Sequence, residues 1–182
     1  MTLLARLTFL WLALSGTGTL GAPPASEYQV KAAYLFNFGQ FVDWPATAFG
    51  SPSAPFNICI LGEDPFGSIL DEVVKGEKLV GRPVMVRRFS RSEEAAGCNI
   101  VFLGRSEVGH LADSLHALRG QHVLTVTDAA GDETRDAAIV LITQNNHIRL
   151  RINLAEARAN DLVISSKLLR PAEVVGYPGA TP

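Results

Sequence analysis

Two kinds of hydrophobic pattern alternate along the chain: apolar residues at every third or fourth position, and short, almost uninterrupted apolar runs. The first pattern is typical of a helix with one buried face, and the second of a strand buried on both faces. Runs at 56–62, 84–89, 99–103 and 122–127 supply four such strands. The alternation predicts an α/β fold in three layers, with a mostly parallel central sheet flanked by helices.

The first helix is predicted over 27–42, with Ser26 as N-cap and Gln29 at the capping-box position. It ends before Trp44-Pro45, because the residue before a proline avoids the helical conformation. Six aromatic side chains lie in this segment, so more than one face of the helix is apolar. Either the helix is buried on two sides or one face binds a partner. Further helices are predicted at 64–75, 106–118, 154–160 and 165–169.

The last third of the chain has a different pattern. Strands at 138–143 and 148–152 flank a turn with two asparagines, which tolerate the positive φ angles of a tight hairpin. In the second strand, apolar residues alternate with Arg149 and Arg151. One face of this strand is therefore in water, which predicts an antiparallel edge hairpin near the C-terminus.

The N-terminus has the order of a secretory signal peptide: Arg6, then an apolar run at 7–14, then small residues. The run is too short to cross roughly 30 Å of hydrocarbon, which takes about 20 residues. We therefore predict that residues 1–25 are a signal peptide cleaved near Ala22 or Ala25, and that the protein is exported. An uncleaved N-terminal anchor is the alternative.

The remaining chain is long enough for one hydrophobic core and too short for two, so residues 26–175 are predicted to form a single domain. The Gly/Pro-rich residues 176–182 are predicted to be a flexible tail. The formal net charge of −2 becomes −3 once the leader with Arg6 is removed. This charge offers no basic face for nucleic acid and no polybasic patch for a membrane surface. No later segment is long and apolar enough for membrane insertion.

Both cysteines, Cys59 and Cys98, lie in the exported part. An even number of cysteines in an exported chain favours a disulfide, while two buried thiols that never meet are the alternative. The cysteine spacing does not suit a metal site, and the four scattered histidines do not complete one. No metal and no other cofactor is predicted.

The chain carries no nucleophile elbow, no phosphate-binding loop, no dinucleotide fingerprint and no zinc-protease motif. Ser165-Ser166-Lys167 lacks the helical spacing of a Ser/Lys catalytic pair and is better explained as a helix cap. No catalytic residue is predicted, and the protein is not expected to be an enzyme.

Two other pairs are candidate binding residues. Glu63 and Asp64 follow the first buried strand, at the end where open α/β sheets bind ligands, although carboxylates before a helix also serve as caps. Arg149 and Arg151 could hold a carboxylate or an acidic partner, or could protect a sheet edge from aggregation.

Taken in order, seven segments resemble the YfiR-like family of periplasmic repressors, and together they cover almost all of the exported chain. They are 27–38, 41–45, 56–62, 81–84, 98–103, 148–154 and 162–169.

The resemblance implies a periplasmic protein that acts by binding. In that family a repressor holds an inner-membrane diguanylate cyclase inactive through the periplasmic domain of the cyclase, and an outer-membrane lipoprotein relieves the inhibition by sequestering the repressor. Disulfides keep the repressor folded. Cys59 and Cys98 match one cysteine pair of the family, and a second, later pair has no counterpart here.

The leading hypothesis is a periplasmic inhibitor that docks on the sensor domain of a membrane signalling enzyme, with Trp44 and the arginine-bearing strand as candidate contacts. The rival hypothesis is a small-ligand sensor with a crevice at the strand ends near Gly62 and Gly104. Whether the domain forms a homodimer is left open by the sequence.

Overall fold

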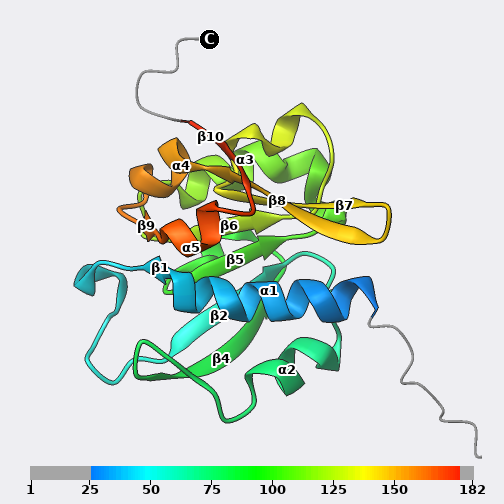
Figure 1. Cartoon of the computed structure of the whole chain (residues 1–182). Coiled ribbons are helices and arrows are strands. Elements are labelled where there is room, and N and C mark those ends of the chain that lie inside the picture. The colour runs from blue at the N-terminus through cyan, green and yellow to red at the C-terminus, as the bar shows by residue number, and fades with distance from the viewer. Residues whose placement is uncertain (1–25, 177–182) are drawn as a thin grey trace, which may run out of the picture.

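The computed structural model describes residues 26–176. The predicted signal peptide and all but the first residue of the predicted tail lie outside this range. The described chain forms a central sheet with helices on both faces (Figure 1). The predicted three-layer α/β fold is therefore confirmed.

The central sheet has eight strands. They are β2 (Phe56–Leu61), β3 (Lys78–Leu79), β4 (Arg82–Phe89), β5 (Ile100–Leu103), β6 (Leu124–Thr127), β7 (Ile139–Gln144), β8 (His147–Asn153) and β10 (Glu173–Val175). Their order across the sheet is β10-β8-β7-β6-β5-β2-β4-β3. The strands from β4 to β7 in this order are mutually parallel, β8 is antiparallel to β7, and β10 is parallel to β8.

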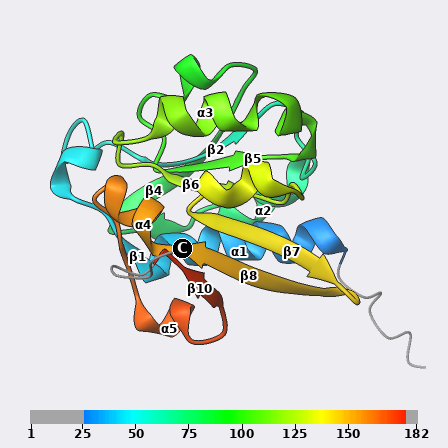
Figure 2. The same cartoon turned by 90° about the horizontal axis from the view of Figure 1, so that it is seen from above.

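Within the described residues, five α-helices cover the two faces of the sheet. They are α1 (Glu27–Phe41), α2 (Ser68–Val74), α3 (Leu111–Leu118), α4 (Leu154–Ala159) and α5 (Ser166–Leu169). Four of them, α1, α2, α4 and α5, contribute to the larger core, and α3 contributes to the core on the opposite face. Figure 2 shows α3 on one side of the sheet and α1 and α2 on the other.

Short elements complete the chain. The two-stranded sheet of β1 (Val42–Asp43) and β9 (Val163–Ile164) is antiparallel. The 3-10 helices are η1 (Ala46–Ala48), η2 (Ser92–Ala95), η3 (Arg105–His110) and η4 (Asp132–Asp136).

The start of α1 follows the predicted capping box. The Ser26 hydroxyl accepts the N–H of Gln29, and the Gln29 side chain accepts the N–H of Ser26. The helix ends at Phe41 because Val42 takes an extended conformation and pairs with Ile164. Leu35 and Phe38 are fully buried, so one face of α1 lies in the core.

The predicted helix at 64–75 begins later than expected, at Ser68. The Asp64 carboxylate accepts the N–H of Phe66, two residues along, so this carboxylate closes a turn and does not cap the helix. Gly67, with a φ of +55°, then separates the turn from α2. The expected helical start at Asp64 was therefore wrong by one turn.

The predicted helix at 106–118 is divided between η3 and α3. Ser106 does not cap it, because the Ser106 hydroxyl accepts the N–H of Glu63 from another loop. Val108 is 37 % exposed, whereas Leu111 and Leu118 are buried. The apolar stripe therefore begins with α3.

The predicted hairpin is confirmed as β7 and β8. Its two turn residues, Asn145 and Asn146, have φ angles of +50° and +60°, as a tight turn between twisted strands requires. The sequence did not predict β10, which pairs with the last three residues of β8. Part of the outer edge of β8 is therefore covered.

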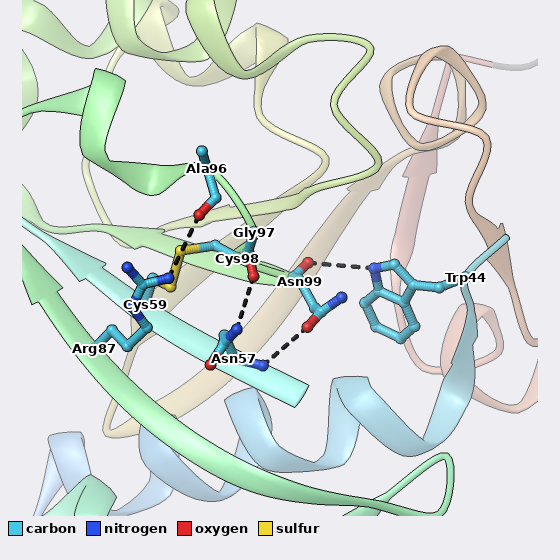
Figure 3. Close-up of a disulfide and its surroundings, with 8 residues drawn as sticks. All are labelled: Trp44, Asn57, Cys59, Arg87, Ala96, Gly97, Cys98 and Asn99. Carbon is cyan, nitrogen blue, oxygen red and sulfur yellow. Dashed lines mark hydrogen bonds between the residues drawn. A yellow bond between two sulfur atoms is a disulfide. The ribbon is translucent and has the colours of Figure 1, made fainter. Parts of the chain in front are cut away.

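Cys59 and Cys98 form the predicted disulfide, which joins β2 to the chain just before β5 (Figure 3). Both cysteines are buried. Beside them Asn57 donates to the carbonyl oxygen of Gly97, and the Asn99 side chain accepts the N–H of Asn57. The bridge thus fixes the loop that enters β5 against the centre of the sheet.

We expect loss of this bridge to lower the free energy of unfolding by about 4 kcal/mol, because the 39-residue separation closes a long loop in the unfolded chain. Urea unfolding of the oxidised protein, the reduced protein and a Cys59→Ala/Cys98→Ala variant measures the loss. The variant should not respond to reductant. An unchanged urea midpoint in protein whose two thiols are shown to be free by mass spectrometry would contradict the expectation.

Candidate functional site

The antiparallel end of the sheet has an open face. Register places Val140 opposite Arg151 and Ile142 opposite Arg149, so these four side chains share one face. Val140 is buried in the smaller core, Ile142 is only partly buried and Arg149 is exposed. The face therefore changes from core to solvent across β7 and β8.

Three neighbouring depressions meet on this face, and Arg151 lines all of them. The largest has a volume of about 670 Å³ and lies between β7, β8 and the segment that joins α5 to β10. We call it the arginine groove. Its lining residues are Ile142, Thr143, Gln144, Arg149, Leu150, Arg151, Arg170, Pro171, Ala172 and Glu173. The two smaller depressions have volumes of about 320 and 290 Å³.

The arginine groove carries a local excess of positive charge. Its three arginines face one acidic residue, Glu173, whose carboxylate lies 3.4 Å from Nε of Arg151. Among the described residues, Arg149 and Arg170 have no carboxylate within 4.0 Å. Two guanidinium groups are thus available to an acidic group from outside.

A buried ion cluster lies beneath the smallest depression. The Lys31 side chain is fully buried, and its Nζ lies 2.5 Å from both Asp128 Oδ2 and Glu27 Oε1. The Asp128 side chain is also fully buried and accepts the Tyr28 hydroxyl at 3.0 Å. Arg105, more than half exposed, lies 2.9 Å from Glu27. The cluster joins α1 to the loop that follows β6.

Two groups of the cluster have shifted pKa values. The hydrogen bond from Lys31 holds the pKa of Glu27 below its usual range, and the Glu27 carboxylate also accepts the Thr143 hydroxyl of β7. Burial, with the neighbouring Asp128 carboxylate as the next cause, raises the pKa of Tyr28 to about 12. Glu27 is therefore ionised and Tyr28 neutral at pH 7.

Local sequence patterns contain little sign of this cluster. Lys31 occupies one polar position in an aromatic helix, and long-range pairing with Asp128 is not encoded in local spacing. The one available signal was the acidic residue directly after the fourth predicted strand, at the end where functional side chains gather in α/β sheets.

The structure separates the candidate residues into three places. Arg149 and Arg151 lie on the open face. Glu63 and Asp64 lie in the turn after β2, where Asp64 forms a 2.6 Å ion pair with Arg88.

Trp44 lies at the opposite end of β2. Its ring is edge-on to Phe56, with centroids 4.9 Å apart. Its Nε1 donates to the carbonyl oxygen of Asn99 at 3.3 Å (Figure 3). These contacts give Trp44 a packing role, and it does not join the arginines.

The crevice expected near Gly62 and Gly104 is at the switch point of the sheet. The parallel strands run β4-β2-β5-β6-β7, the 2-1-3-4-5 order in which ligands bind between the first and third strands. Here the Glu107 side chain lies so close to Gly62 that a side chain there would collide with it. The Ser106 hydroxyl also holds the N–H of Glu63. Side chains of the chain itself therefore fill much of this position.

Within residues 26–176, no three or more His, Cys, Asp or Glu side chains gather as a metal site would require. The helices of the same range are all too short or too polar to cross a membrane.

A family model described as YfiR/HmsC-like matches residues 28–173. The match runs from the first turn of α1 to the first residue of β10, and so covers nearly all of the described chain. Among curated proteins, none matches the chain.

We expect Asp128→Asn to lower the free energy of unfolding by about 3 kcal/mol, because the buried Lys31 ammonium loses its fully buried counter-ion and keeps only the partly exposed Glu27. The matched control is Asp71→Asn, which breaks a partly exposed pair with Arg88 and should cost less than about 1 kcal/mol. Urea unfolding at pH 7 compares the two. A Lys31→Met/Asp128→Leu variant should regain much of the loss, and equal losses for Asp128→Asn and Asp71→Asn would contradict the expectation.

We expect Tyr28 to make the protein less stable as the pH rises from about 10 to about 12. In this range the unfolded tyrosine has lost its proton while the folded one keeps it, so rising pH favours unfolding. Tyr28→Phe removes this contribution, so the stability difference between the parent protein and the variant should shrink across the range. Urea unfolding at several pH values measures it, and a difference that stays constant would count against the raised pKa.

Proposed function

Because the chain belongs to the YfiR/HmsC-like family, we propose that it is a regulator of cyclic-di-GMP signalling that acts in the periplasm. It binds the periplasmic sensor domain of a membrane signalling enzyme, a diguanylate cyclase, and holds the enzyme inactive. The family match over residues 28–173 is the observation that carries this proposal. The signal-peptide pattern of residues 1–25 supports export.

The geometry favours binding of a partner over catalysis. One face of the sheet carries arginines that have no carboxylate partner among the described residues, and such a face suits a macromolecular partner with acidic groups. The disulfide suits an oxidising compartment.

Inhibition by binding alone sets a physical requirement. A regulator shifts the conformational equilibrium of its target only by the difference between its affinities for the inactive and active states. A hundredfold preference for the inactive sensor conformation corresponds to about 2.7 kcal/mol. A few well-placed contacts on the sensor domain suffice for such a preference. Sequestration by an outer-membrane lipoprotein would release the enzyme by lowering the free concentration of the regulator.

A small-ligand sensor is the second candidate, and the three depressions lined by Arg151 favour it. A ligand that binds only the folded state must raise the thermal unfolding midpoint. A thermal-shift screen of carboxylate-bearing small molecules therefore separates this candidate from a purely protein-binding regulator.

Deletion of the gene from its natural host should raise the cellular concentration of cyclic-di-GMP, because the cyclase would lose its inhibitor. The full chain should restore the low concentration, whereas a chain without residues 1–25 should not, because it stays on the wrong side of the membrane. Immunoblotting shows that both chains accumulate equally. An unchanged concentration after deletion, or full restoration by the leaderless chain, would overturn the proposal.

A further inference from the structure

The outer edge of β8 is only half paired. β10 pairs with Arg151, Ile152 and Asn153, the last three residues of β8. Within the described chain, residues 147–150 have a strand partner on the β7 side alone. The outer backbone N–H and C=O groups of this half have no partner strand among the described residues, and such groups can receive another strand.

The arginine groove borders this half-edge. Arg149 lies in the unpaired half, and Arg170 comes from the opposite wall, which also contributes Pro171 and Ala172. The three arginines and Glu173 together give the groove a formal charge of +2, although the whole chain has a net charge of −2. Backbone pairing groups, apolar wall atoms and unpaired guanidinium groups are thus combined in one groove.

We propose that the arginine groove binds an extended acidic segment of a partner protein. The segment adds a strand along residues 147–150 and places carboxylates on Arg149 and Arg170. The inference rests on the proposed function for the identity of the partner, the sensor domain, but not for the chemistry of the groove.

Each part of the groove has a separate task. Strand addition supplies main-chain hydrogen bonds that do not depend on side chains. Arginine–carboxylate pairs select acidic side chains and speed association, although exposed pairs alone add little affinity. A second copy of this chain is a poor occupant, because edge-to-edge pairing of two β8 strands would bring like charges together.

Two labelled probe peptides test the inference: one alternates Glu and Val, and the other alternates Lys and Val. Fluorescence anisotropy should show binding of the Glu peptide to the oxidised protein, with weakening as salt rises. Alternate backbone N-methylation of the Glu peptide should abolish binding, because one edge of the added strand loses its donors. Unchanged binding of the methylated peptide would overturn strand addition.

Charge reversal identifies the groove. Arg149→Glu/Arg170→Glu should weaken the binding of the Glu peptide at least tenfold and should create binding of the Lys peptide. Arg158→Glu in α4, an exposed site outside all three depressions, is the control and should change neither. Since the Lys peptide reports a gain of binding, loss of folding cannot imitate the expected result. Equal effects of the groove and control variants, or no binding of the Glu peptide, would overturn the inference.

The same variants separate this inference from the proposed function. If deletion raises cyclic-di-GMP and the groove variant restores the low concentration as fully as the Arg158→Glu control, the regulatory function stands and the groove assignment fails. If the Glu peptide binds as expected but deletion leaves cyclic-di-GMP unchanged, the groove stands and the proposed function fails.

Discussion

The buried ion pair between Lys31 and Asp128 is the interaction on which the placement of the other elements depends. Removing two charges from water costs several kcal/mol per ion, so such a pair is tolerated only where hydrogen bonds complete it. Here Glu27 and Tyr28 do so from the first turn of α1. The pair ties α1 to Asp128, the residue that follows the carboxyl end of β6.

That position in turn holds the hairpin. Glu27 accepts the hydroxyl of Thr143 in β7, so the ion cluster reaches the strand next to β8. In Figure 2 the β7–β8 hairpin extends beside the first turns of α1. The start of α1 therefore helps to hold β7 in place, together with the pairing of β7 to β6 and of β10 to β8.

Local patterns predicted the elements that local chemistry determines. The two asparagines of the hairpin turn and the Ser26 capping box both lie where the sequence indicated. An element decided by distant contacts was missed: β10 forms because the chain after α5 returns to β8. For the same reason Arg149 and Arg151 could be predicted to share a face, whereas the contribution of Arg170 to their groove required the fold.

The division of the sheet explains why recognition is proposed at its antiparallel end. The central parallel strands β2, β5 and β6 are buried throughout and paired on both sides, so they leave neither face nor edge for a partner. The disulfide lies in this parallel half, in the core on the α3 side. The antiparallel half has one face toward solvent, and residues 147–150 of its strand β8 are paired on one side only. Reduction of the disulfide would therefore affect binding through loss of the folded state, because neither cysteine lines the arginine groove.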